Sequence, residues 1–237
     1  MNGEVLALGL VWYLAFLFST TCHEAAHALA AKLGGDLTAF HGGQVSLDPI
    51  PHIRREPFGM VVFPILSYAV GGWMMGWASA PYDPRWAERH PRRAAWMALA
   101  GPAANFSLMI LAAILIHAGI WMRVFEAPDA ADFTHIVAAA TASGVTPGAA
   151  TFLSVLFSLN LLLGTFNLLP LPPLDGFGAV GLLLGEDAAA RFQSFGRQMR
   201  GFSIIGLLIA WQVFGPIFRP IFRLSLRALY PGSGYGQ

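Results

Sequence analysis

The chain has 237 residues, of which 56% are hydrophobic and only 11% are charged. Soluble domains carry about 25% charged residues, so this composition favours a membrane protein. The formal net charge of +1, with arginines in short clusters rather than along one face, argues against a nucleic-acid partner. A single cysteine excludes an internal disulfide framework.

The first apolar run, residues 5–33, predicts a helix of about 43 Å, enough to cross a hydrocarbon core of roughly 30 Å. Near its end it carries His23-Glu24-Ala25-Ala26-His27. Two histidines four residues apart share one helix face, so both can bind a single Zn²⁺. Glu24 would then lie beside the metal, free to take a proton from a bound water. An unpaired charge at this depth would cost about 2.5–3.5 kcal/mol, so the motif predicts a bound partner.

Plainer interpretations of this motif stay open. The two histidines could be structural residues beside a capping or paired Glu24, and a third ligand would distinguish the alternatives. Cys22 is a candidate ligand, but it is rotated by about 100° from the histidine face, which favours a packing role. No cleavable signal peptide is evident, so the first helix is expected to remain in the mature protein.

Residues 36–57 are rich in helix breakers. Pro49 and Pro51 predict short strands or turns packed at the membrane surface instead of a helix. His41 and His52 are interpreted as polar loop residues.

The apolar run 60–80 is long enough to span a membrane but is interrupted by Pro64 and by glycines at 71–72. Non-helical backbone at membrane depth survives only where protein or a wet cavity covers it. This run is therefore predicted to be broken or re-entrant.

The runs 94–122 and 149–169 predict two further spanning helices. The first holds Gly101-Pro102-Ala103-Ala104-Asn105, in which the proline removes a backbone donor and the asparagine places an amide inside the membrane. His117, near its far end, is interpreted as an interfacial residue and no ligand.

The run 149–169 ends in Asn167-Leu-Leu-Pro170 and leads to Leu174-Asp175-Gly176. The prolines around position 172 stop the helix and leave Asp175 in irregular backbone at one membrane face. Asp175 is therefore the predicted third ligand. An Asp before Gly is also a routine turn residue, and that alternative stays open.

The remaining C-terminal sequence holds one more apolar run, 201–218, which predicts a fourth span. Arg219, Arg223 and Arg227 follow at helical spacing and suggest an amphipathic tail on the membrane surface. Residues 231–237 are expected to be a disordered tail.

The predicted directions of the helices decide whether the His23–His27 motif and Asp175 can lie at the same depth in the membrane. If His23, His27 and Asp175 bind one metal, the helices at 5–33 and 149–169 must run parallel. Arginines are frequent in loops 34–57 and 81–93 and sparse in 123–147. The positive-inside rule then predicts a site near the cytoplasmic face of the plasma membrane, with the N-terminus outside.

Together the three motifs resemble the site-2 protease family of intramembrane zinc metalloproteases, in the short branch without PDZ or CBS modules. The resemblance covers about residues 15–180. It implies three core helices around one Zn²⁺ per chain. The ligands that it implies are His23, His27 and Asp175.

The resemblance also implies roles for three further residues. Glu24 would be the catalytic acid/base. Asn105 and Asn167 would position the substrate strand or stabilise the tetrahedral oxyanion. An edge strand near 36–57 or 71–77 could capture an unwound substrate by β-addition.

The expected fold is an all-α polytopic membrane bundle with three core transmembrane helices, a short membrane-associated β or re-entrant segment, and an additional C-terminal helix. Residues 1–230 are expected to form a single integral-membrane metalloprotease domain. The expected function is cleavage of transmembrane or membrane-proximal peptide bonds. The expected partners are a transmembrane protein as substrate and the surrounding lipid bilayer. Homo-oligomerisation is left open.

Two other functions fit parts of the pattern. A membrane metal transporter or sensor would use the same ligands, but transporters generally show structural repeats and none is visible. A non-catalytic binding protein of the same fold would not need a base, so the intact Glu24 argues against it.

Overall fold

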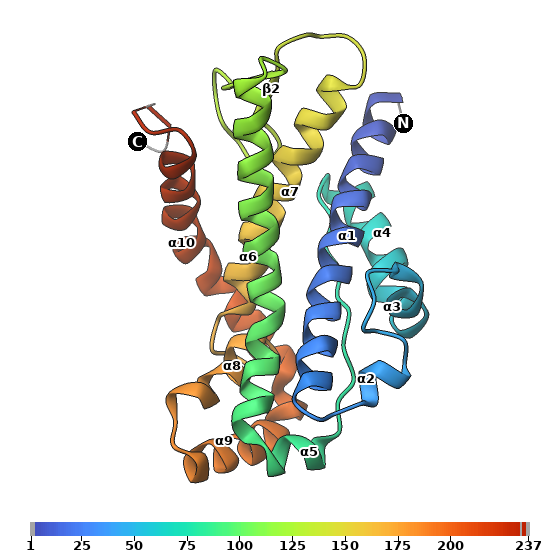
Figure 1. Cartoon of the computed structure of the whole chain (residues 1–237), viewed down its shortest axis with the longest axis vertical. Helices are drawn as coiled ribbons and strands as arrows, with labels where there is room; N and C mark the ends of the chain where they lie inside the picture. The colour runs from blue at the N-terminus through green and yellow to red at the C-terminus, as the bar shows by residue number, and fades with distance from the viewer. Residues whose placement is uncertain (1–2, 233, 236–237) are drawn as a thin grey trace.

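The computed structural model describes residues 3–232 and 234–235 (Figure 1). Four helices in this part of the chain are long and apolar enough to cross a membrane: α1 (Gly3–Leu33), α6 (Pro91–Trp121), α7 (Thr146–Asn167) and α10 (Ser203–Leu229). The predicted all-α polytopic bundle, with three core helices and an additional C-terminal helix, is confirmed.

Helices α1, α6 and α7 pack against one another and form the core. Of the most apolar window of α7, 61% is buried, against 17% for α10, so α7 is central and α10 peripheral. Figure 1 shows α1 and α7 running downward while α6 runs upward. The parallel arrangement that a shared metal site requires is therefore present.

The prediction that residues 36–57 form strands or turns instead of a helix is wrong about the helix, although a turn at 42–43 is present. This stretch contains the short helices α2 (Thr38–His41) and α3 (Pro49–Arg55). Pro49 occupies the first helical position of α3, where a missing N–H has no consequence. The Asp48 side chain caps the helix by accepting a hydrogen bond from the backbone N–H of Ile50 at 2.9 Å.

Residues 58–83 run along the side of α1 toward its N-terminal part and then return. After the π-helical turn η1 (Phe58–Val62), α4 (Phe63–Gly71) reaches the N-terminal part of α1, where the Tyr68 hydroxyl donates to the Val5 carbonyl at 3.0 Å. Residues 72–83 then run beside α1 without helical turns (Figure 1). At their end the backbone N–H of Asp83 donates to Asp36 at 2.8 Å, so the excursion begins and ends at the same end of α1.

The connecting elements are short. A two-stranded antiparallel sheet pairs β1 (Phe125–Glu126) with β2 (Ala138–Ala139) in the loop between α6 and α7. The remaining elements lie at the opposite end of the bundle: α5 (Pro84–Arg89), α8 (Asp175–Ala179), η2 (Val180–Leu183), α9 (Glu186–Gln198) and η3 (Met199–Phe202).

Helix α10 corrects the prediction of a separate surface tail after Phe218. The helix continues unbroken to Leu229, and Leu226 and Leu229 are buried in an apolar cluster with Ile136 of the loop between α6 and α7. The three predicted tail arginines lie on its exposed face: Arg219, Arg223 and Arg227.

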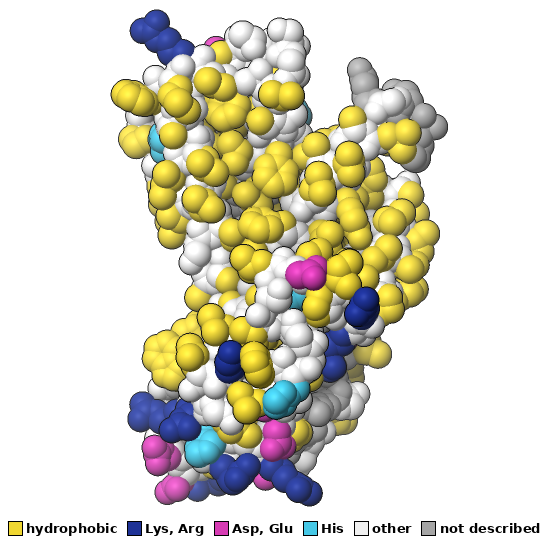
Figure 2. All heavy atoms as spheres, turned by 45° about the vertical axis from the view of Figure 1, so that its right-hand side comes forward, with side chains coloured by type: hydrophobic (Ala, Val, Ile, Leu, Met, Phe, Trp, Pro, Cys, Tyr) yellow, Lys and Arg dark blue, Asp and Glu magenta, His cyan; other side chains and the backbone are white. Residues whose placement is uncertain are grey.

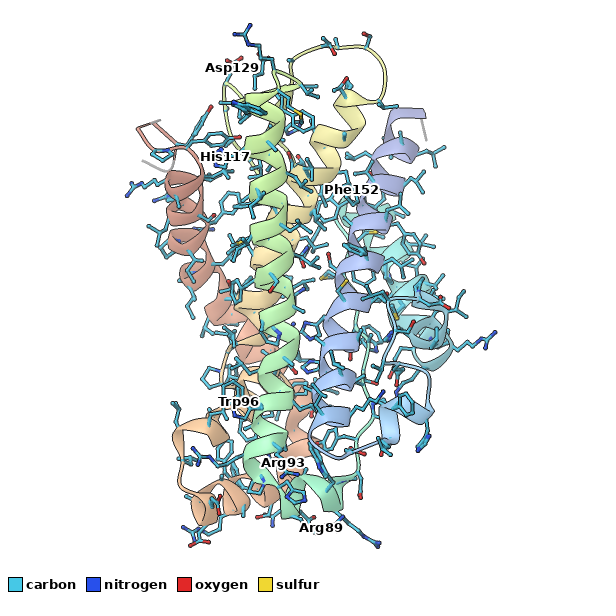
Figure 3. The ribbon with its side chains drawn as sticks, in the orientation of Figure 1. Arg89, Arg93, Trp96, His117, Asp129 and Phe152 are labelled. Carbon is cyan, nitrogen blue, oxygen red and sulfur yellow. The ribbon has the colours of Figure 1, made fainter. Side chains whose placement is uncertain are left out.

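Charge is distributed unevenly over the surface. Figure 2 shows charged side chains gathered at the lower end, whereas hydrophobic side chains cover the middle of the molecule. Figure 3 places Arg89 and Arg93 at this lower end and Asp129 at the opposite one. An apolar belt between two polar ends is what a bilayer-embedded bundle requires.

Candidate metal centre

The motif histidines lie on one buried face of α1. His23 and His27 are one helical turn apart, and their Nε2 atoms are 3.0 Å from each other. Only 7% of His23 and 6% of His27 are exposed, so both rings are removed from bulk solvent.

The other nitrogen of each ring contacts α6. His27 Nδ1 lies 2.7 Å from the carbonyl oxygen of Met97, which can only accept a hydrogen bond. His23 Nδ1 lies 2.6 Å from the side-chain oxygen of Asn105. Because both Nδ1 atoms are donors, both Nε2 atoms carry lone pairs directed into the space between α1 and α6.

Asp175 reaches the same space from the loop that follows α7. Its Oδ2 atom lies 3.0 Å from His23 Nε2 and 3.3 Å from His27 Nε2. A Cβ on Gly176 would lie 2.2 Å from the carbonyl oxygen of Leu168, so only glycine lets the chain turn back this closely. Asp175 is the first residue of α8, and its side chain is 22% exposed.

These three side chains fit a zinc ion. Three electron-rich atoms converge, and a shared proton or a metal ion would stabilise them. Zinc bonds of about 2.0–2.2 Å in a tetrahedron place ligand atoms about 3.3 Å apart, close to the distances found here. Among the described residues, His23, His27 and Asp175 are the histidine, cysteine and carboxylate side chains close enough to hold a metal ion together.

Gly101 closes one side of this centre. A Cβ at this position would lie 2.3 Å from His27 Nε2 and 2.5 Å from His23 Nε2. The next residue, Pro102, is fully buried within α6 and has no N–H to donate to the preceding turn. Gly101 therefore supplies a surface without a side chain next to the two Nε2 atoms.

Glu24 is buried beside the histidines but is separate from the ligand group. It is 5% exposed, and its carboxylate is not among the converging donor atoms of the described residues. Two histidines and one carboxylate leave a fourth position of zinc open, as in catalytic zinc sites. Glu24 follows His23 directly in the chain and is buried with it.

The two asparagines expected at the site have different surroundings. Asn105 is fully buried, and both ends of its amide bond to protein, to His23 and to Asn160. Asn167 is half-buried at the end of α7, and its side chain makes no hydrogen bond to the part of the chain that the structure describes. Of the two, only Asn105 has its side-chain amide fixed by hydrogen bonds within the described residues.

The other candidate residues lie outside the centre. Cys22, His41, His52 and His117 are not in the ligand group found among the described residues. His52 is instead fully buried and contacts the Ser46 carbonyl at 3.1 Å. Asn160 was not expected as part of the site, although an amide in the middle of an apolar span signals a polar partner.

Substitution of Asp175 by Asn tests whether this residue is a ligand or a turn residue. We expect Asp175→Asn to lower both zinc occupancy and activity, because an amide is a much weaker ligand than a carboxylate. Zinc content would be measured at limiting free metal. The same change at the exposed Asp129 is the control. Full zinc and full activity in Asp175→Asn would mean that the third ligand lies elsewhere, since Asn before Gly serves a turn equally well.

Comparisons with known proteins agree with this geometry. The family described as "Peptidase family M50" matches residues 11–208. The chain is 32% identical over 187 residues to "Putative zinc metalloprotease YwhC" of Bacillus subtilis (strain 168), covering 78% of this chain and 74% of that protein.

A second relative is "Putative zinc metalloprotease Rip2" of Mycolicibacterium smegmatis, with 32% identity over 165 residues, 70% of this chain and 54% of that protein. The match thus spans about half the length of that relative. No solved structure gives a significant match to the chain. The chain therefore belongs to peptidase family M50, the site-2 protease family of membrane-embedded zinc metalloproteases.

Proposed function

We propose that this metalloendopeptidase cleaves transmembrane or membrane-proximal peptide bonds of membrane proteins. The observation that carries the proposal is the position of the metal centre within a spanning helix. His27 lies only five residues, about 8 Å along the helix axis, before Lys32 at the end of α1. The reacting bond must therefore enter the apolar layer, close to one of its faces.

Each polar residue of the centre has a distinct proposed task. His23, His27 and Asp175 hold one zinc ion. When bound, zinc supplies the Lewis acidity that polarises a peptide carbonyl and acidifies a water molecule. The Glu24 carboxylate takes the proton of the attacking water and returns it to the nitrogen of the leaving amine.

The asparagines are proposed to act at different distances from the substrate. The amide of Asn167 can donate to the backbone of the substrate or to the oxyanion. Asn105 remains assigned to substrate positioning, and the contacts of its amide favour an indirect route, through the orientation of His23.

The unwound segment 72–83 offers a route for the substrate backbone. A helical substrate hides its carbonyls in its own hydrogen bonds, so it must unwind before cleavage. The segment runs beside α1 without a regular ladder to another strand of the described chain, and it is held by single contacts such as Trp77 N–H to the Gly59 carbonyl at 3.1 Å. An extended substrate can pair with such backbone by β-addition.

The distribution of charge supports a cytoplasmic orientation of the site in the plasma membrane. The arginines of α5 and of the start of α6 lie at the end of the bundle where α1 finishes, and Figure 3 labels Arg89 and Arg93 there. Three arginines in the C-terminal half of α10 lie toward the other end of the bundle and oppose this charge difference, but they are fewer: Arg219, Arg223 and Arg227. The positive-inside rule then places the N-terminus outside.

We further propose that residues 1–230 form one integral-membrane domain. The Tyr230 hydroxyl donates to the Ile136 carbonyl at 2.8 Å, which joins the end of α10 to the outer loop. The disordered tail predicted at 231–237 stays a prediction, and residues 233 and 236–237 lie outside the described residues. Homo-oligomerisation is left open.

The function is tested by cleavage of a model transmembrane peptide in proteoliposomes. The zinc-loaded protein should cut within the apolar span, about 8 Å from its cytoplasmic end, because the centre lies at that depth. The masses of the products identify the bond, which reports both depth and side. Cleavage restricted to a water-exposed loop would contradict the proposal, and cleavage near the outer end would reverse the orientation.

A further inference from the structure

We propose that Asn160 of α7 is a positioning residue of the metal centre, acting through Asn105 to hold His23 in the one neutral tautomer that can bind zinc. The inference rests on the proposed role of His23 as a ligand. Asn160 does not touch the centre, and it belongs to none of the three motifs. Its connection to His23 is a chain of hydrogen bonds through fully buried groups.

The chain of bonds begins at a group whose role is fixed. The carbonyl of Leu156 can only accept, and Asn160 Nδ2 lies 2.8 Å from it. This nitrogen also donates to the hydroxyl of Ser19 at 2.8 Å. The NH₂ end of the Asn160 amide is thereby assigned, and its oxygen must face the opposite way.

The orientation of Asn160 determines that of Asn105. Asn160 Oδ1 lies 2.9 Å from Asn105 Nδ2 and can only accept, so Asn105 must present its NH₂ end to α7. Its oxygen then faces α1, at 2.6 Å from His23 Nδ1. An oxygen at this distance requires a hydrogen on Nδ1, which leaves the lone pair of His23 on Nε2, the atom directed at the metal position.

The burial of these groups supports the assigned orientations of the Asn160 and Asn105 amides. Ser19, Asn105 and Asn160 are all 0% exposed, so water cannot replace a lost partner. An unpaired amide within a membrane span is costly, which explains why each of these groups has a protein partner. Ser19 stands one helical turn before His23 on the same face of α1, so the bonds join all three core helices directly behind the ligand.

Replacing Asn160 by Leu removes the acceptor and keeps the number of side-chain heavy atoms. The Asn105 amide is then free to rotate by 180° and present its NH₂ end to His23. In that arrangement Nδ1 becomes the acceptor and the proton moves to Nε2, where it excludes zinc. Loss of an outer hydrogen-bond partner of a metal-binding histidine typically weakens metal affinity about 10–100-fold.

The test compares zinc dissociation constants by chelator competition on the full-length protein in detergent. We expect Asn160→Leu to bind zinc about 10–100-fold more weakly than wild type. Asn160→Asp should stay within a few-fold of wild type when its carboxyl group is protonated, because one oxygen still accepts from Asn105 and the other donates its proton to the Leu156 carbonyl. Ser158→Ala is the matched control: Ser158 is equally buried on α7, but its hydroxyl has no hydrogen-bond partner in the described chain.

A spectroscopic measurement needs no variant. In the zinc-free wild-type protein, at a pH where the ring is neutral, the ¹⁵N shifts of His23 should show a protonated Nδ1 and a bare Nε2. The opposite tautomer would overturn the proposal. So would zinc affinity in Asn160→Leu equal to wild type, or equal losses in Asn160→Leu and Ser158→Ala.

One further variant separates this inference from the proposed function. His23→Ala should lose zinc binding altogether at micromolar metal. If His23→Ala binds zinc like wild type, the metal centre itself is wrongly assigned and the proposed function fails with it. If His23→Ala loses zinc while Asn160→Leu does not, only the role of Asn160 is wrong.

Discussion

Glu24→Gln should bind zinc like wild type and lose peptidase activity by at least about 10²–10⁴-fold, the usual contribution of a general acid–base group. The amide has nearly the shape of the carboxylate but cannot take a proton from water at neutral pH. The three predicted ligands are untouched, since Glu24 is not part of the converging donor group. Zinc content and the rate of cleavage of a transmembrane peptide would be measured on the same preparation.

The control for this variant is Glu126→Gln, the same change at an exposed position of β1 in the loop between α6 and α7. It should leave both zinc and activity unchanged. Loss of zinc in Glu24→Gln would mean that Glu24 is a ligand. Retention of both zinc and activity would mean that another group transfers the proton.

The parts of the site that could be predicted from sequence are those with local causes. The spacing of His23 and His27 is a property of one helix, and a helix can be inferred from an apolar run. Asp175 could be predicted because prolines force irregular backbone at a membrane face, where a carboxylate needs a reason to be present.

The features that sequence reasoning missed depend on packing between distant segments. Asn160 lies 55 residues from Asn105 along the chain, and only the packing of α7 against α6 brings the two amides together. Pro49 was interpreted as a helix breaker, whereas at the first position of α3 it initiates a helix. The effect of a proline depends on where the helix begins, and that is set by the Asp48 cap.

Gly101→Ala should abolish zinc binding at metal concentrations that saturate the wild type. The new Cβ would lie 2.3 Å from His27 Nε2 and 2.5 Å from His23 Nε2, where a metal ion bonded to both nitrogens must lie or pass. We expect a loss of affinity beyond the about 100-fold typical of an outer hydrogen-bond partner, because the methyl group competes with the ion itself.

Gly101→Ala also separates blocking of the centre from general destabilisation. In a helix interior, replacing Gly by Ala ordinarily stabilises by about 0.8–1.0 kcal/mol, so α6 itself gains helix propensity. Gly148→Ala is the matched control, a glycine of α7 whose added Cβ would meet nothing within 4 Å. It should bind zinc normally. Normal zinc binding by Gly101→Ala in the same competition assay would instead mean that the ion does not lie between the two histidines and α6, and the assignment of the centre would have to be abandoned.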